Sequence, residues 1–86
     1  MKTIIDVAIE VIKEKCANYE YIEFKEIFDI VESELKDLWL EKAEKQGIDY
    51  KDILELKMGE LYKIMTLDSR FVRNEEGLWT KKRGFE

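Results

Sequence analysis

The cationic side chains near the C-terminus are the residues of this sequence with the clearest potential chemistry. Residues 70–83 contain five bases and two acids, whereas residues 20–34 contain six acids and one lysine. The five bases are Arg70, Arg73, Lys81, Lys82 and Arg83. Guanidinium and ammonium groups bind phosphates and carboxylates, so this cluster is a candidate contact for a nucleic-acid backbone or an acidic protein surface.

Catalysis and metal binding have little support in the residue types. The chain contains no histidine, so the usual general base near neutral pH and the commonest metal ligand are both missing. Cys16, the single cysteine, lies on an apolar helical stripe and is expected to be a small core residue. The glycines stand singly at 47, 59, 77 and 84, which excludes a phosphate-binding loop. We therefore expect a non-catalytic protein without a metal or cofactor.

Length and composition favour one small soluble domain. The 86 residues are 45% hydrophobic and 41% charged, and they contain no proline and no Gly/Ser linker. A single folded domain over residues 1–86 is expected, and we expect it to be a monomer. Asp6 and Glu10 interrupt the first apolar run, which argues against a signal peptide or a membrane span, and the lone cysteine fits a reducing compartment. The expected location is the cytoplasm.

Three amphipathic helices are predicted before the cationic segment. The first runs from Thr3 to about Ala17, with Thr3 and Asp6 as a capping box and Asn18 and Tyr19 at its end. The second begins at Phe24 and ends at Gly47, and four-residue spacing pairs Glu32 with Lys36 and Glu41 with Lys45. The third follows an N-cap at Asp49 and closes at Leu67-Asp68.

The expected core faces of the last two helices follow from their apolar spacing. On the second helix the buried set is Phe24, Ile27, Phe28, Val31, Leu35 and Leu38. On the third helix it is Ile53, Leu56, Leu61, Ile64 and Met65, with Leu54 and Met58 beside them.

A β-hairpin is predicted over residues 70–82. Its strands are Arg70 to Arg73 and Leu78 to Lys81, separated by a turn from Asn74 to Gly77 in which glycine takes a positive φ. Phe71 and Trp79 are expected to fill the core, because so short a hairpin must lean on the helices. A short strand near 21–24 would add a third strand. The predicted fold class is therefore α+β, mainly α: a winged helix-turn-helix with three helices and a three-stranded antiparallel sheet.

The third helix would be the DNA-reading helix of such a fold, and its side chains suit that role poorly. It carries Lys51, Lys57 and Lys63 together with several acids, but it has no arginine, asparagine or glutamine to read bases. The net charge of −5 also opposes simple DNA binding. We expect weak or no direct binding of nucleic acid.

The segment Leu67-Asp68-Ser69-Arg70-Phe71, with Trp79 eight positions on, resembles the N-terminal HARE-HTH domain of the delta subunits of bacterial RNA polymerase. The resemblance covers nearly the whole chain, including the opening helix and the third helix running into Leu61-Tyr62. It differs in extra residues around 40–48, and the sequence ends at Glu86 without the long acidic tail associated with the family. If the protein has no such tail, activities attributed to the tail do not extend to it.

Three functions follow from these observations. The resemblance implies an accessory subunit that binds core RNA polymerase and modulates transcription initiation and recycling. One alternative is a winged-helix DNA-binding regulator that contacts phosphates through its basic wing, and another is a HARE-HTH adaptor of a different DNA-processing complex.

The candidate partner contacts each have a structural alternative. Arg70 either faces a partner or pairs with an acid of the domain, and Asp68 is expected to bond the backbone at the corner. The run of Lys81, Lys82 and Arg83 is either a docking site or a solvated strand end. Trp39 is the best candidate for an exposed apolar contact, although burial is favoured.

Overall fold

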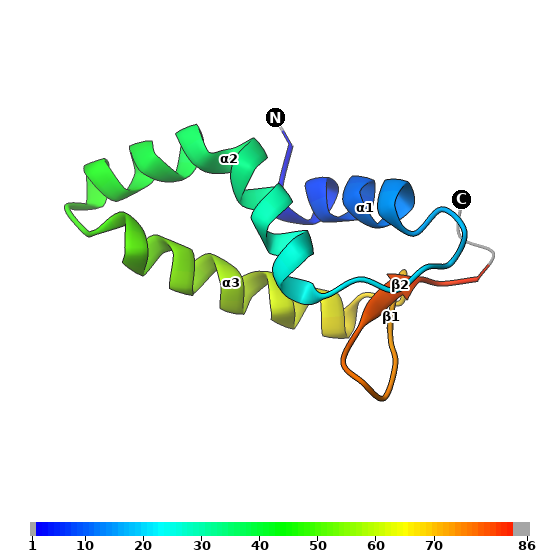
Figure 1. Cartoon of the computed structure of the whole chain (residues 1–86). Helices are drawn as coiled ribbons and strands as arrows, with labels where there is room; N and C mark the ends of the chain where they lie inside the picture. Colours follow the sequence, from blue (N-terminus) through cyan, green and yellow to red (C-terminus); the bar gives the residue numbers. More distant parts are fainter. Residues whose placement is uncertain (1, 84–86) are drawn as a thin grey trace.

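The computed structural model describes residues 2–83, which form three helices followed by a β-hairpin (Figure 1). The helices are α1 (Ile4–Lys15), α2 (Phe24–Gln46) and α3 (Tyr50–Leu67), and the strands are β1 (Phe71–Arg73) and β2 (Trp79–Lys81). This order confirms the predicted α+β, mainly α class. The ends of the predicted 1–86 domain lie outside the described residues. No helix of residues 2–83 is long and apolar enough to cross a membrane.

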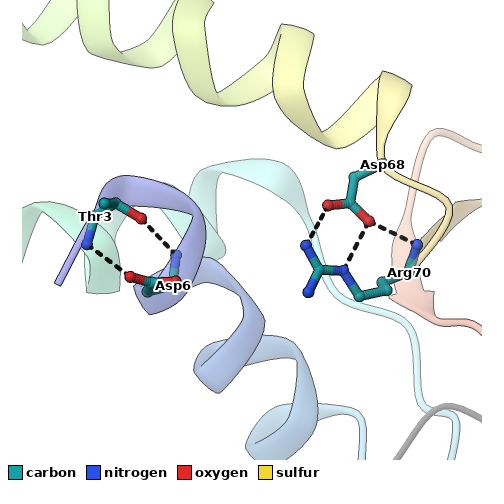
Figure 2. Close-up of polar contacts among 4 residues, drawn as sticks. All are labelled: Thr3, Asp6, Asp68 and Arg70. Carbon is teal, nitrogen blue, oxygen red and sulfur yellow. Dashed lines mark hydrogen bonds and ion pairs between the residues drawn. The ribbon is translucent and has the colours of Figure 1, made fainter.

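Helix α1 begins with the predicted capping box. The Asp6 amide donates to Thr3 Oγ1 at 3.3 Å, and the Thr3 amide donates to the Asp6 carboxylate at 3.0 Å (Figure 2). These bonds from Thr3 hold the pKa of Asp6 below its ordinary value. After α1 ends, Tyr19 takes the left-handed conformation at φ 63°, whereas the sequence favoured the adjacent Asn18 because asparagine tolerates this conformation better.

Helix α2 extends through the region where its apolar pattern fades. Gly47 ends it with φ 67°, as expected, and Glu41 pairs with Lys45 at 3.0 Å. Glu32 instead accepts a hydrogen bond at 2.9 Å from the Tyr50 hydroxyl, which joins α2 to the start of α3. Burial, reinforced by the Glu32 carboxylate, raises the pKa of Tyr50 to about 12.

The buried face of α2 differs from the predicted one in its second half. Buried positions continue at four-residue spacing through Leu35, Trp39 and Ala43, whereas Leu38 is exposed. Four residues make slightly more than one turn of a helix with 3.6 residues per turn, so a stripe of buried residues at this spacing drifts slowly around α2. Leu38, three residues after Leu35, falls on the other side of this stripe. The prediction that Leu38 belongs to the core is therefore wrong.

The centre of α3 also corrects a prediction. Leu56 is 65% exposed, and the position facing α2 is taken by Lys57, whose ammonium lies 6.0 Å from the centre of the Trp39 ring. The methylene stem of a lysine can cover an aromatic ring while its charge stays near water. Asp49 does occupy the N-cap position, but its side chain makes no capping hydrogen bond.

One hydrophobic core joins all three helices to the hairpin. Helix α1 packs against both α2 and α3, and it also contacts β2. The core residues are Ile4, Val7, Ala8, Val11, Ile12, Cys16, Ile27, Phe28, Val31, Leu35, Trp39, Ala43, Ile53, Leu61, Met65, Phe71 and Trp79. The predicted burial of Phe71, Trp79 and Cys16 is confirmed.

The sheet has two strands, so the predicted third strand near 21–24 is wrong. Only Ile22 pairs with the hairpin, through hydrogen bonds of 2.9 and 2.8 Å between its backbone and that of Trp79. Residue Tyr19 turns the chain with a positive φ, and Phe24 already belongs to α2. The intervening segment is therefore too short to extend the pairing beyond one residue.

The hairpin turn forms as its sequence predicts. Asn74 Oδ1 accepts hydrogen bonds of 2.9 Å from the amides of Glu76 and Leu78, and Gly77 has φ 84°. These interactions fix the strand register, in which Val72 lies opposite Thr80.

Candidate functional site

Arg70 forms a fork with Asp68 at the corner between α3 and β1. Its Nε donates to Asp68 Oδ1 at 2.9 Å, its Nη2 donates to Oδ2 at 2.6 Å, and its backbone amide donates to Oδ1 at 2.9 Å (Figure 2). A bidentate pair combined with a backbone bond is geometrically restrictive. Arg70 is thus paired within the domain, and Asp68 holds the corner as expected.

The fork also makes stability depend on pH. The Arg70 guanidinium lowers the pKa of Asp68 below its ordinary value, and Asp68 raises the pKa of Arg70. A carboxylate with a lowered folded-state pKa stabilises the fold above its unfolded pKa, and this stabilisation disappears as the pH falls through the folded pKa.

Asp68→Asn should therefore cost stability at pH 7 and progressively less as the pH falls from about 5 to about 2. Urea unfolding of the wild type and the variant at several pH values measures this difference. Arg70→Gln, which removes the other partner, should show the same trend. A wild type and Asp68→Asn that stay equally far apart down to pH 2 would contradict the assignment.

Arg73 lies against α3 and not with the other cations. Its guanidinium Nη1 donates to the Tyr62 hydroxyl, and its Cζ lies 6.0 Å from the centre of the Trp79 ring. Tyr62 in turn meets the edges of Phe24 and Trp79, with ring centres 5.4 and 6.2 Å away. Arg73 therefore borders an aromatic group at the junction of α2, α3 and the hairpin.

Lys81 and Arg83 both lie against the aromatic ring of Tyr19. The Lys81 ammonium lies 5.0 Å and the Arg83 guanidinium 4.9 Å from the centre of the Tyr19 ring. Lys82, which separates them in the sequence, is exposed, and its amide donates to the Arg70 carbonyl at 3.1 Å. We call Tyr19, Lys81, Lys82 and Arg83 the basic edge. The five predicted cations thus separate into this edge, the corner fork and the Tyr62 contact.

Trp39 is buried, with 2% of its surface exposed, and its ring stacks on Phe28 at 5.8 Å between centres. The burial favoured by the sequence is confirmed, so the ring offers little surface to a partner. Its neighbours Leu38 and Leu40 are exposed instead.

Pattern reasoning missed an apolar hollow beside α3. It has a volume of about 500 Å³ and is lined by Phe24, Glu55, Met58, Gly59, Tyr62 and Lys63. Met58 and Tyr62 are both exposed, although each has a large side chain with mostly apolar surface. No pattern in the sequence indicates this hollow, because Met58 was expected to pack beside the core.

The described residues offer no metal-binding cluster of histidine, cysteine and acidic side chains. Cys16 is buried, and its thiol donates to the Trp79 carbonyl at 3.8 Å. Burial raises the pKa of Cys16, so its reactive thiolate form is disfavoured. Two surfaces are candidates for function because of their charge and their apolar lining: the basic edge and the outward face of α3.

No family model, curated protein or solved structure matches this chain.

Proposed function

We propose that this domain is a winged helix with a reduced sheet that acts as a delta-like accessory subunit. In this role it docks on core RNA polymerase in the cytoplasm and modulates transcription initiation and recycling. The residues that carry the resemblance support a shared fold, since Asp68 and Arg70 hold the corner while Phe71 and Trp79 are buried. Because these four residues are paired or buried within the domain, the docking surface must be formed by other residues.

The observation that carries the proposal is the concentration of positive charge at the basic edge of an otherwise acidic chain. Lys81, Lys82 and Arg83 lie together on a protein of net charge −5. Arg70 is already neutralised by Asp68. Complementary potentials favour docking of such an edge on an acidic surface of a large partner, and they act mainly on the association rate.

The outward face of α3 favours a protein partner over DNA. It presents Asp52, Glu55 and Lys63 together with apolar Met58. A helix that enters the major groove needs donors for base edges and cations for phosphates. Helix α3 has no donors of the base-reading kind, and its three lysines are balanced by three acids.

Simultaneous reversal of Lys81, Lys82 and Arg83 to glutamate tests the docking site. We expect the triple variant to lose most of its co-purification with core RNA polymerase while its melting temperature stays nearly unchanged, because all three groups lie at the strand end. The matched control reverses Lys36, Lys42 and Lys51, which are exposed on α2 and α3, and makes the same charge change. Equal retention of the triple variant and the wild type would exclude the basic edge, and a wild type that does not bind would reject the polymerase assignment.

Duplex DNA should bind this domain only weakly, with a Kd of ~10⁻⁴ M or higher near physiological salt. The reason is the acidic balance of the chain and the absence of base-reading side chains on α3. Residual binding should come from the basic edge and disappear as salt is added. Titration of labelled duplexes at several salt concentrations measures this. Sequence-dependent binding in the micromolar range would favour a DNA-binding regulator.

A further inference from the structure

The outward face of α3 is symmetric about Gly59. Successive residues of an α-helix are about 100° apart, so positions three, four and seven residues from Gly59 share its face. All of these positions are exposed. They are Asp52, Glu55, Leu56, Tyr62, Lys63 and Thr66. In Figure 1 this helix is the lowest of the three, with α1 and α2 above it and the hairpin reaching below its C-terminal end.

Gly59 has no structural role that the described chain reveals. It lies in the interior of α3, and a Cβ atom added there would meet nothing within 4 Å. Glycine weakens a helix relative to alanine, so this position is not optimised for the isolated domain. A missing side chain in the middle of an exposed face does allow another backbone to approach closely.

Residues at equal distances on either side of Gly59 are complementary. Glu55 and Lys63 lie four residues before and after it, and no ion pair joins either of them to another residue within 2–83. Leu56 and Tyr62 lie three residues before and after it, with exposed fractions of 65% and 41%. Two of the three mirrored pairs on this face are thus complementary, whereas Asp52 mirrors Thr66.

We propose that this face binds a second copy of the chain, with the two α3 helices antiparallel and crossing at Gly59. A two-fold axis through that point places Glu55 of each copy opposite Lys63 of the other, and Leu56 opposite Tyr62. The interface is isologous, so every ion pair and every apolar contact occurs twice. The hollow formed by Phe24, Met58 and Tyr62 borders the crossing and gives each copy apolar surface to cover.

This dimer replaces the monomer expected from the sequence, and it does not depend on the polymerase proposal. One helix face per copy makes a small interface, and the net charge of −5 on each copy opposes association. The pairing is therefore of moderate strength, with a dissociation constant of ~10⁻⁵–10⁻⁴ M. The dimer requires near-physiological salt, because charges more than about 8 Å apart then repel each other only weakly.

Sedimentation equilibrium of the purified protein from about 10 μM to about 1 mM tests the dimer directly. Lys63→Glu should weaken the dimer about tenfold or more, because it places two acids opposite each other twice. The double variant Glu55→Lys with Lys63→Glu restores both pairs in reversed order and should return the affinity to near that of the wild type. Lys36→Glu, an exposed change on α2, is the control for net charge and should have little effect. Circular dichroism melts establish that each variant is folded.

Gly59→Gln separates a docking role from a structural one. Glutamine favours helix and has open space at this position, so the melting temperature should rise by about 3–6 °C. Its side chain keeps the two helices apart, so the dimer should weaken about tenfold or more. A wild type that remains monomeric at about 1 mM would overturn the proposal, as would a folded double variant that fails to regain affinity. Because polymerase is not part of these measurements, their outcome is independent of the docking test.

Discussion

Phe71→Ala is expected to destabilise the domain by about 3–5 kcal/mol. Phe71 is 6% exposed and borders the same hollow as Met65 and Trp79, where the hairpin meets the end of α3. Removal of the ring takes apolar surface from the core and leaves a cavity that the surrounding groups fill only partly. A domain of this size has a total stability of roughly 5–10 kcal/mol, so the variant would be close to its unfolding midpoint at 37 °C.

The neighbouring residue supplies a matched control for Phe71. Val72 lies on the opposite face of β1 and is exposed, so Val72→Ala should cost less than about 1 kcal/mol. Urea unfolding followed by circular dichroism measures both variants under the same conditions. A cost below about 1 kcal/mol for Phe71→Ala would show that the ring contributes to a surface and not to the core.

Trp39→Ala is expected to cost about 3–5 kcal/mol through the packing of α2 against α3. The indole stacks on Phe28 and lies under the Lys57 side chain, so its loss opens a cavity between the two long helices. It also removes the ring that makes the burial of the Lys57 stem favourable. The melting temperature should fall by more than about 10 °C.

Leu40 is the control for Trp39, one residue further along α2. It is 42% exposed, so Leu40→Ala should cost about 1 kcal/mol or less. Thermal and urea unfolding of both variants gives the comparison. Similar costs for the two substitutions would mean that Trp39 is not packed between α2 and α3.

Local features of the fold could be predicted because neighbouring residues suffice to form them. The capping box needs only Thr3 and Asp6, and it forms as expected. Gly47 and Gly77 take the positive φ values that their positions require, 67° and 84°. The Asp68 carboxylate bonds an amide two residues away. Each of these interactions depends on a few consecutive residues and little on the remaining fold.

The faces of long helices could be predicted only in part, because a neighbouring helix selects among adjacent positions. Leu38 and Leu56 satisfied the expected apolar spacing, yet both are exposed. Trp39 and Lys57 face the interior at those levels because their large side chains meet each other across α2 and α3. Spacing alone gives no preference for that pair, since lysine is normally counted as a surface residue.

The arrangement of the candidate surfaces was decided by the tertiary structure. The sequence identified Arg70, Arg73 and the Lys81–Arg83 segment as cations and grouped them into one wing. Contacts with residues distant in the chain separate them, since Tyr62 of α3 binds Arg73 and Tyr19 lies under Lys81.

By itself the sequence determined three helices, a hairpin, their caps and turns, and an acidic balance with a basic end. Tertiary structure decided that the sheet has two strands, that Leu38 and Leu56 are exposed, and that an apolar hollow lies beside Gly59 on α3. The physical reason is the range of the interactions. Caps, turns and helical periodicity depend on neighbours within about four residues, whereas burial and surface grouping depend on which distant elements pack together.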